Sequence, residues 1–536
     1  MTVWISRRPD REVASELAAG HGPLAGIRVA VTDDVDVAGL PTTAGCPDFS
    51  HRPDRDAAAV AALRAAGAVV VGKTNMDQFG TGLLGTRSPY GTVRDHRRPD
   101  FVSGGASSGS AVAVAAGEAD IAVATGSGRI PAALQGIVAV TPTIGVICAE
   151  GVTPGGESRD GVSLFAPDVE LANRAMAVVA AGACDRRWPA DTRLAAPPNP
   201  VVAVPRELPA LDPTWHAAFA RAVATLSDAG AVIVEIDLSP FLTAGRLLRE
   251  GAMAGERCSA VVEFVDSRPG VTLDPAVAAI IAGARAVTAH EVSRDRTEVD
   301  RLRRVALAEL EGADGLLVPA APMHPRINEV AADPEGVDAR MGTYTHFSDA
   351  FGMCGVTVPA GTAGDAQFGV TVLARAFDDA VALDVAAMLT GDPAPADVWP
   401  LASLHFVELV VFGAHLRGGP LAHQLTDLGA RFAGEVTTAP RYRMTALDTV
   451  PPKPAVTRVG DGAPGAVLTG HRWLLSTAAL GAFLTALPAP MQLGKIELAD
   501  GTWRTGFGCD GEAAAAGTDL SRYGSWTAAL AQGAVG

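Results

Sequence analysis

The chain has 536 residues, 48% of them hydrophobic and 19% charged, which is typical of a globular protein with a large buried core and more than one domain. Its 43 Lys and Arg against 59 Asp and Glu give a net charge of −16, which repels phosphate backbones and anionic lipid surfaces. We therefore expect neither nucleic acid nor a membrane as a partner. Because the sequence has no apolar run long enough to span a membrane and no apolar stretch of a secretory signal, we expect a cytoplasmic protein.

Two segments of the first part of the chain pair a helix with a short strand. The first has an Ala- and Leu-rich helix that ends at Gly67, followed by an apolar strand over 68–71. In the second, Asp212 and Pro213 supply an N-cap and a first-turn proline, and a strand over 231–236 follows the helix. This alternation predicts an α/β domain.

A Pro- and Asp-rich segment over 391–400 predicts a linker, so we place the two domains at 1–395 and 396–536. The second domain has a strand candidate over 405–412. It also has a predicted hairpin over 495–507, with Asp500-Gly501 as its tight turn. These features predict a smaller, β-rich α+β domain.

Six cysteines lie singly along the chain, without a CxxC pair or a histidine at ligand spacing: Cys46, Cys148, Cys184, Cys258, Cys354 and Cys509. We predict that they are reduced thiols and hold neither a metal nor a disulfide. No cofactor is expected.

Two serine-bearing glycine loops lie close together, SGGASSGS over 103–110 and Gly126-Ser127-Gly128. A glycine loop that leads into a helix gathers backbone N–H groups that can hold an oxyanion, which suits acyl transfer. The alternative is that both loops are tight turns in a packed core. The first loop also matches the spacing of a nucleophile elbow, but it lacks the preceding hydrophobic strand that such an elbow needs.

These loops and their surroundings resemble the amidase signature family, and within it the allophanate hydrolases. The matching segments are GPLAGIRVAV, VGKTNMDQFGTGLLGTRSPYG, VSGGASSGSAVAVAAG and GSGRIPAA, followed later by VFGAHLRGGPLAHQLTDLGARF and ADGTWRTGFGCDGE. The resemblance implies an α/β amidase domain, with a mixed central sheet flanked by helices. It also implies a C-terminal domain similar to the γ-glutamyl-cyclotransferase fold.

The resemblance bears on catalysis at three positions. The family uses a lysine, a serine preceded by a cis peptide bond, and a serine nucleophile that the lysine activates through the middle serine. Here Thr32 stands in the place of the lysine, Ala106 in the place of the middle serine, and Ser127 is equivalent to the nucleophile. The approach to Ser127, which includes Gly126, is three residues shorter than in the family and lacks residues that supply oxyanion-hole N–H groups. We therefore predict that robust hydrolysis is lost.

Other positions of the resemblance concern substrate binding. Arg340 remains in a matching segment, and a planar guanidinium suits a carboxylate ligand; the alternative is a structural or surface arginine. Ser107 and Gly126 complete the expected binding set. Lys73 resembles a second lysine of the family and is not the missing base; the alternative is a structural or solvated lysine.

In the C-terminal domain, the segment VFGAHL places His415 at a strand-to-loop junction, where an imidazole can transfer a proton near neutral pH. A structural histidine is the alternative reading for His415 and for His423. Asp510 stands where the family usually has a glutamate.

We therefore predict an allophanate-hydrolase-like protein with an inactive amidase site, repurposed for binding, scaffolding or regulating a protein partner. Its expected ligand is a small carboxylated amide or urea-derived molecule. The alternative is an active hydrolase that releases ammonia from such a ligand, with Ser127 activated by Ser107 or Ser108. A third reading leaves chemistry only in the C-terminal domain. A homodimer is expected because the family commonly dimerises.

Overall fold

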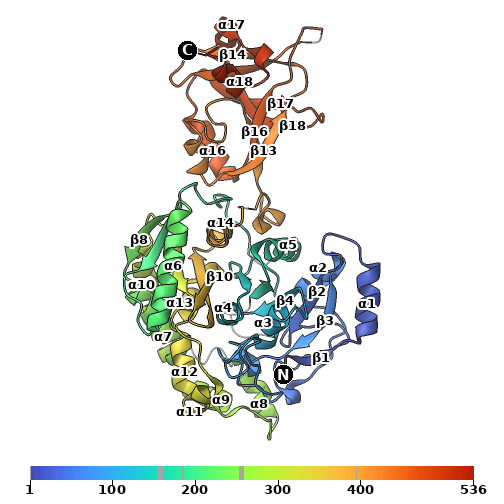
Figure 1. The fold of residues 1–536 in the computed structure, drawn as a ribbon, viewed down its shortest axis with the longest axis vertical. Coiled ribbons are helices and arrows are strands. Elements are labelled where there is room, and N and C mark those ends of the chain that lie inside the picture. Colours follow the sequence, from blue (N-terminus) through green and yellow to red (C-terminus); the bar gives the residue numbers. More distant parts are fainter. Residues whose placement is uncertain are drawn as a thin grey trace. The chain divides into compact units, whose positions relative to one another are not determined.

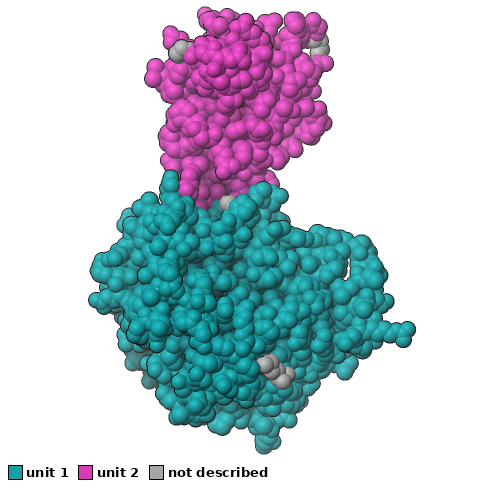
Figure 2. Space-filling view, viewed as in Figure 1, with its two compact units in different colours: residues 1–187, 199–403 teal, residues 188–198, 404–536 magenta. Residues whose placement is uncertain are grey.

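The computed structural model describes residues 2–153, 161–182, 186–252, 259–393, 395–460 and 462–535. The chain divides into two compact units, one of Met1–Arg187 and Asn199–Ser403 and the other of Trp188–Pro198 and Leu404–Gly536 (Figure 2). The first unit thus extends a few residues past the expected boundary at 395. Cys184 and Cys258 lie outside the described residues, and the other four cysteines are free thiols.

Within the described residues, the first unit contains an eleven-stranded mixed sheet with the order β1-β3-β2-β4-β6-β5-β10-β11-β9-β7-β8 (Figure 1). Its strands are β1 (Trp4–Arg7), β2 (Arg28–Thr32), β3 (Val69–Thr74), β4 (Ile121–Thr125), β5 (Val138–Thr141), β6 (Val162–Ala166), β7 (Val201–Pro205), β8 (Val232–Ile236), β9 (Gly315–Pro319), β10 (Cys354–Ala363) and β11 (Ala366–Ala374). Strand β2 runs parallel to β3 and β4, whereas β4 to β6 and β10 to β11 are antiparallel. The predicted α/β class with a mixed sheet is confirmed.

Helices accompany this sheet along the whole first unit. They are α1 (Asp10–Ala19), α2 (Ala58–Ala65), α3 (Ser108–Ala115), α4 (Arg129–Gln135), α5 (Val169–Ala180), α6 (Pro213–Asp228), α7 (Ser239–Glu250), α8 (Ser259–Ser267), α9 (Pro275–Ala286), α10 (Ala289–Glu309), α11 (Ile327–Ala332), α12 (Pro334–Met341), α13 (His346–Phe351) and α14 (Asp379–Thr390), with short 3₁₀ turns η1 (Pro47–Phe49), η2 (Gln78–Gly80) and η4 (Trp399–Ala402). None of the helices in the described ranges is long and apolar enough to cross a membrane.

Both predicted helix–strand pairs are present. Helix α6 starts as expected, because the Asp212 side chain accepts a hydrogen bond from Thr214 N and Pro213 occupies the first turn. Strand β3 continues past Gly72, where we expected it to end. A Cβ at Gly72 would lie 2.3 Å from Ser6 O, so the glycine allows strand β1 to approach β3 closely.

Helix α3 places the first glycine loop against the sheet. Its sequence SGSAVAVA is buried almost throughout, and it packs against β2, β3 and β4. Small side chains permit this approach, since a Cβ at Gly109 would lie 2.3 Å from Val3 O. The loop that precedes α3 is thereby held next to the C-terminal end of β4.

The second unit is β-rich, as predicted. Its five-stranded sheet has the order β13-β16-β12-β18-β17 and its three-stranded sheet the order β15-β14-β19, counted over the residues described. The strands are β12 (Val407–Val411), β13 (Arg431–Thr437), β14 (Tyr442–Leu447), β15 (Lys453–Arg458), β16 (Thr469–Leu475), β17 (Met491–Glu497), β18 (Trp503–Cys509) and β19 (Thr518–Asp519). The helical segments are α15 (His423–Thr426), α16 (Thr477–Ala486), α17 (Gly511–Ala516), η5 (Ser521–Tyr523) and α18 (Trp526–Ala531).

The predicted hairpin is formed by β17 and β18, which pair Lys495 with Thr505 around the Asp500-Gly501 turn. Gly501 has φ +82°, a conformation that favours glycine, and Asp500 accepts a hydrogen bond from Thr502 N at 2.9 Å. Apolar side chains from β12, β16 and α16, such as Leu409, Trp473 and Phe483, form the core of this unit.

Candidate active site

The two glycine loops of the first unit line one cavity of about 110 Å³. A buried water needs roughly 10–15 Å³ on this measure, so the cavity accommodates several waters or a small molecule. Its described lining includes residues from both loops, from the segment after β2 and from the start of α13. Among these lining residues are Asp34, Gly105, Ala106, Thr125, Gly126, Ser127, Gly128, Thr141, Val162, Thr345, His346 and Asp349.

The loop that carries Ser127 links the end of β4 to the start of α4. Gly126 and Gly128 have φ +66° and +59°, a region that favours glycine, and a Cβ at Gly128 would lie 2.4 Å from the Phe165 ring. Thr141 Oγ1 donates to Ser127 O at 2.6 Å, and Gly126 N donates to Gly161 O at 3.1 Å. The backbone of this loop is therefore firmly held.

The Ser127 hydroxyl has no hydrogen-bond partner among the residues that the structure describes. A serine nucleophile needs a base within about 2.6–3.2 Å, often through a second group, to remove its proton. Among the described residues, none is hydrogen-bonded to the Ser127 hydroxyl and could serve as its base. What remains is a serine at the wall of a small cavity.

The two positions that differ from the family pattern are Ala106 and Thr32, and only Ala106 is among the described residues that line the cavity with Ser127. Ala106 lines the cavity with a methyl group that can carry no proton, and the Gly105–Ala106 peptide bond is cis. Thr32 ends strand β2 and is fully buried, with its hydroxyl 3.6 Å from Met76 Sδ. Since a hydroxyl bonded to a thioether is not a base at neutral pH, Thr32 does not replace the lysine.

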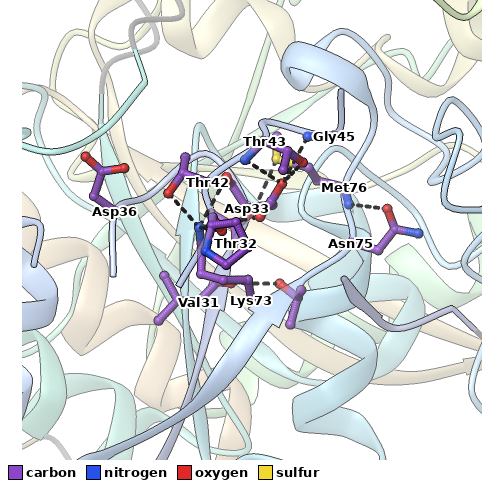
Figure 3. A network of polar contacts seen from close by, with 12 residues as sticks. Val31, Thr32, Asp33, Asp36, Thr42, Thr43, Gly45, Lys73, Asn75 and Met76 are labelled. Carbon is purple, nitrogen blue, oxygen red and sulfur yellow. Dashed lines mark hydrogen bonds and ion pairs between the residues drawn. The ribbon is translucent and has the colours of Figure 1, made fainter. Parts of the chain in front are cut away.

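Lys73 is fully buried on β3, where it pairs with Val31 of β2, the residue before Thr32 (Figure 3). Its Nζ lies 3.0 Å from Thr42 Oγ1 and 3.4 Å from Asp33 Oδ1. Burial lowers the pKa of Lys73, whereas the Asp33 carboxylate opposes that change. Lys73 is not among the described residues that line the cavity. It forms a structural ion pair and is not solvated.

Asp34 follows this ion pair in the chain and does line the cavity. Thr125 Oγ1 donates to Asp34 Oδ2 at 2.5 Å. The other carboxylate oxygen, Oδ1, is buried and has no hydrogen-bond partner from another described residue. Burial raises the pKa of Asp34 from its ordinary 3.8 to about 6, although the Thr125 hydrogen bond opposes this. Asp34 is not among the site residues predicted from the sequence, and the one available signal is its place as the second of two aspartates directly after the buried strand β2.

Helix α13 and the residue before it also contribute to the described lining. Asp349 lies 3.8 Å from Arg129 Nη1, and the same guanidinium nitrogen donates to Thr345 O at 3.3 Å. Arg129 starts α4 and is 1% exposed. The Asp349 carboxylate is therefore partly neutralised, and His346 of the same helix lies beside it in the cavity wall.

The structure places the other expected binding residues away from the cavity. Ser107 is buried behind it, and its Oγ accepts a long hydrogen bond of 3.4 Å from Thr125 N. Ser108 Oγ donates to Asn75 O at 3.4 Å. Arg340 is exposed near the end of α12 and is not part of the described lining. The cavity thus brings together Ser127, Gly126 and Ala106. Its described lining does not include Ser107 or Arg340.

In the second unit, His415 lies just after strand β12 in a narrow cavity of about 20 Å³, which Lys453 and Phe507 also line. The ring stacks on Phe507 at 5.0 Å, and Nε2 pairs with Gln424 Oε1 at 2.8 Å. Burial lowers the pKa of His415, so the ring is neutral at pH 7. Asp510 caps α17 by accepting from Glu512 N at 3.0 Å, which is a structural role.

The first unit has the architecture of an amidase. It combines a mixed sheet and flanking helices with a serine-bearing glycine loop that lines a cavity. Residues 4–383 match the sequence pattern of the family described as Amidase, and residues 407–531 match that of the allophanate hydrolase C-terminal domain. The chain belongs to the amidase family and carries an allophanate hydrolase C-terminal domain.

Individual relatives agree with this assignment. The chain is 36% identical to urea amidolyase of Saccharomyces cerevisiae over 94% of its own length, but it spans only 29% of that protein. Allophanate hydrolase of Kluyveromyces lactis superposes with a TM-score of 0.88 and 32% identity, covering 99% of this chain and 93% of the other. Urea amidolyase of the same organism gives a TM-score of 0.89 at 32% identity, with 99% of this chain and 34% of the other covered.

Proposed function

We propose that this chain uses the amidase cavity to bind a small urea-derived molecule without hydrolysing it. The observation that carries this proposal is the isolation of the Ser127 hydroxyl, which has no hydrogen-bonded base among the described residues. The relatives named for urea and allophanate support a ligand of that chemistry. The family assignment alone does not decide whether hydrolysis is retained, because site chemistry and fold are separable.

Three features support the loss of hydrolysis. Thr32 pairs with a thioether, Ala106 carries no hydroxyl, and Lys73 is engaged with Asp33. When catalytic residues depend on one another, the loss of any one of them already abolishes most of the hydrolysis rate. We therefore expect almost no hydrolysis when several are absent. Ser107 does not compensate, since its Oγ accepts a hydrogen bond from Thr125 N and is not bonded to the Ser127 hydroxyl.

The test is ammonia release from allophanate by the purified chain. The native sequence, Ser127→Ala and a Thr32→Lys/Ala106→Ser double variant are compared, with Ser50→Ala, an exposed position outside the cavity, as the matched control. We expect no ammonia above background from any of the four. Release that disappears only in Ser127→Ala would overturn the proposal and establish an active hydrolase with an unrecognised base.

We also propose that the chain is a homodimer and that the second unit holds His415 for structural reasons. Light scattering after gel filtration decides the oligomeric state. If His415 is structural, His415→Ala should lose its folded state. A folded variant with changed turnover would contradict this proposal.

A further inference from the structure

Part of the lining of the amidase cavity is formed by strained backbone. Ala44 and Phe79 both line the cavity, and both have positive φ angles, +49° and +53°. They are two of the four non-glycine residues with positive φ among the residues that the structure describes. Phe79 N donates to Ala44 O at 2.8 Å, so the two strained positions hold each other. Residues with a Cβ disfavour this region, and those that adopt it cluster at ligand-binding sites, which makes this part of the lining a candidate ligand contact.

The Phe79 ring is held in place by two other aromatic rings. Phe49 meets it edge to face with ring centres 5.6 Å apart, and Phe264 of α8 lies 6.5 Å away. Phe79 also packs against the apolar cluster of α8 and α9, to which Val261, a second lining residue, belongs. The ring is only partly buried and lines the cavity, so apolar surface is open to a ligand. A glycine would fit this backbone better but would supply no ring.

Leu83 and Ile144 add further apolar surface to the lining, because both line the cavity and are likewise only partly buried. The cavity of about 110 Å³ also has room for a molecule larger than urea, since a buried water needs roughly 10–15 Å³ on the same measure. A urea-derived ligand with a short apolar substituent suits both the space and this part of the lining.

We propose that Phe79 determines the specificity of the cavity by binding an apolar substituent of the ligand, which makes an N-alkylurea the favoured ligand class. This inference rests on the proposed binding function and specifies its ligand. The alkyl chain contacts the Phe79 ring, and the ureido group is left for the polar part of the lining, to which Ser127 belongs.

Isothermal titration calorimetry on the full chain compares N-propylurea, biuret and urea. N-propylurea and biuret share a ureido group and have the same number of non-hydrogen atoms, but the rest of the molecule is an alkyl chain in one and a polar amide in the other. A buried CH₂ group strengthens binding about fourfold, so we expect N-propylurea to bind at least tenfold more tightly than biuret or urea. A smaller ratio, tighter binding of biuret, or no binding of any probe would overturn the inference.

The variants Phe79→Ala and Phe79→Gly both remove the ring, but only glycine also relieves the strain of the positive φ. Both should bind N-propylurea at least about fivefold more weakly and change the affinity for biuret less than about twofold. Phe406→Ala, at an exposed phenylalanine of the second unit, is the matched control and should leave all affinities unchanged. A folded Phe79 variant that keeps the native preference would refute the role of Phe79. The ranking of the probes in the native chain needs no variant, so it decides the ligand class if neither variant folds.

Ammonia release from allophanate is measured in parallel. Binding of biuret or urea that is as tight as that of N-propylurea, without ammonia, removes the ligand-class inference and leaves the proposed function in place. Ammonia that depends on Ser127 removes the proposed function itself, whatever the order of affinities.

Discussion

Replacing Asp34 by asparagine should stabilise the first unit at neutral pH. Burial raises the pKa of Asp34 from 3.8 to about 6, so the folded state keeps a proton at pH values where the unfolded chain has released it. The folded state is therefore penalised progressively as the pH rises from about 4 to about 6, and the penalty is constant above that. A pKa difference of one corresponds to about 1.4 kcal/mol, which gives a full penalty of about 3 kcal/mol.

Asparagine has the same shape and can still accept the hydrogen bond from Thr125 Oγ1. Its amide nitrogen is left without an acceptor, which offsets about 1 kcal/mol of the gain. The net stabilisation expected above pH 7 is therefore about 2 kcal/mol. It should vanish near pH 4.5, where the penalty has fallen to about 1 kcal/mol, and become a destabilisation at lower pH. This result would be unusual for a substitution of a cavity residue, because most substitutions destabilise.

Differential scanning calorimetry between pH 4.5 and 8 measures this effect. The midpoint of Asp34→Asn should rise above that of the native chain as the pH increases, by a few degrees at pH 7.5, with Asp36→Asn as the control. A midpoint difference that is independent of pH, or that shrinks as the pH rises, would refute the reasoning that an unpaired carboxylate is buried here.

Three further predictions concern groups outside the cavity. Lys73→Ala should lower the free energy of unfolding by about 3–5 kcal/mol, because Asp33 is left buried without its cation. A calorimetric loss of less than about 1 kcal/mol would mean that water already screens this ion pair. Gln424→Leu should lower the pKa of His415 further, because the hydrogen bond with Gln424 raises this pKa in the native chain. An NMR titration that shows a higher pKa in the variant would contradict this. Asp212→Ala should cost about 1 kcal/mol through loss of the α6 N-cap, and an unchanged unfolding midpoint would speak against that cap.

Local patterns predicted the elements well. The Asp212-Pro213 start of α6 and the Asp500-Gly501 turn depend on residues within a few positions of each other, so the sequence determines them directly. The glycine loops were likewise recognisable, and Ser127 and Ala106 do face the same cavity.

The charges of the site could not be predicted in the same way. Whether Lys73 is solvated or buried depends on β2 and on the loop that carries Thr42, which pack around it only in the folded unit. Arg340 lies in a matching segment, but the orientation of α12 leaves it exposed. Asp34 gains its importance from its unpaired oxygen, which no sequence motif displays.

The central claim is that the amidase cavity binds a small urea-derived molecule without hydrolysing it, and calorimetric injections of allophanate into the native chain test this claim most directly. Binding alone gives heat pulses that return to the baseline after each injection and diminish as the site fills, which is the predicted result. A sustained heat flow that continues between injections and disappears in Ser127→Ala would show turnover at this serine and contradict the account.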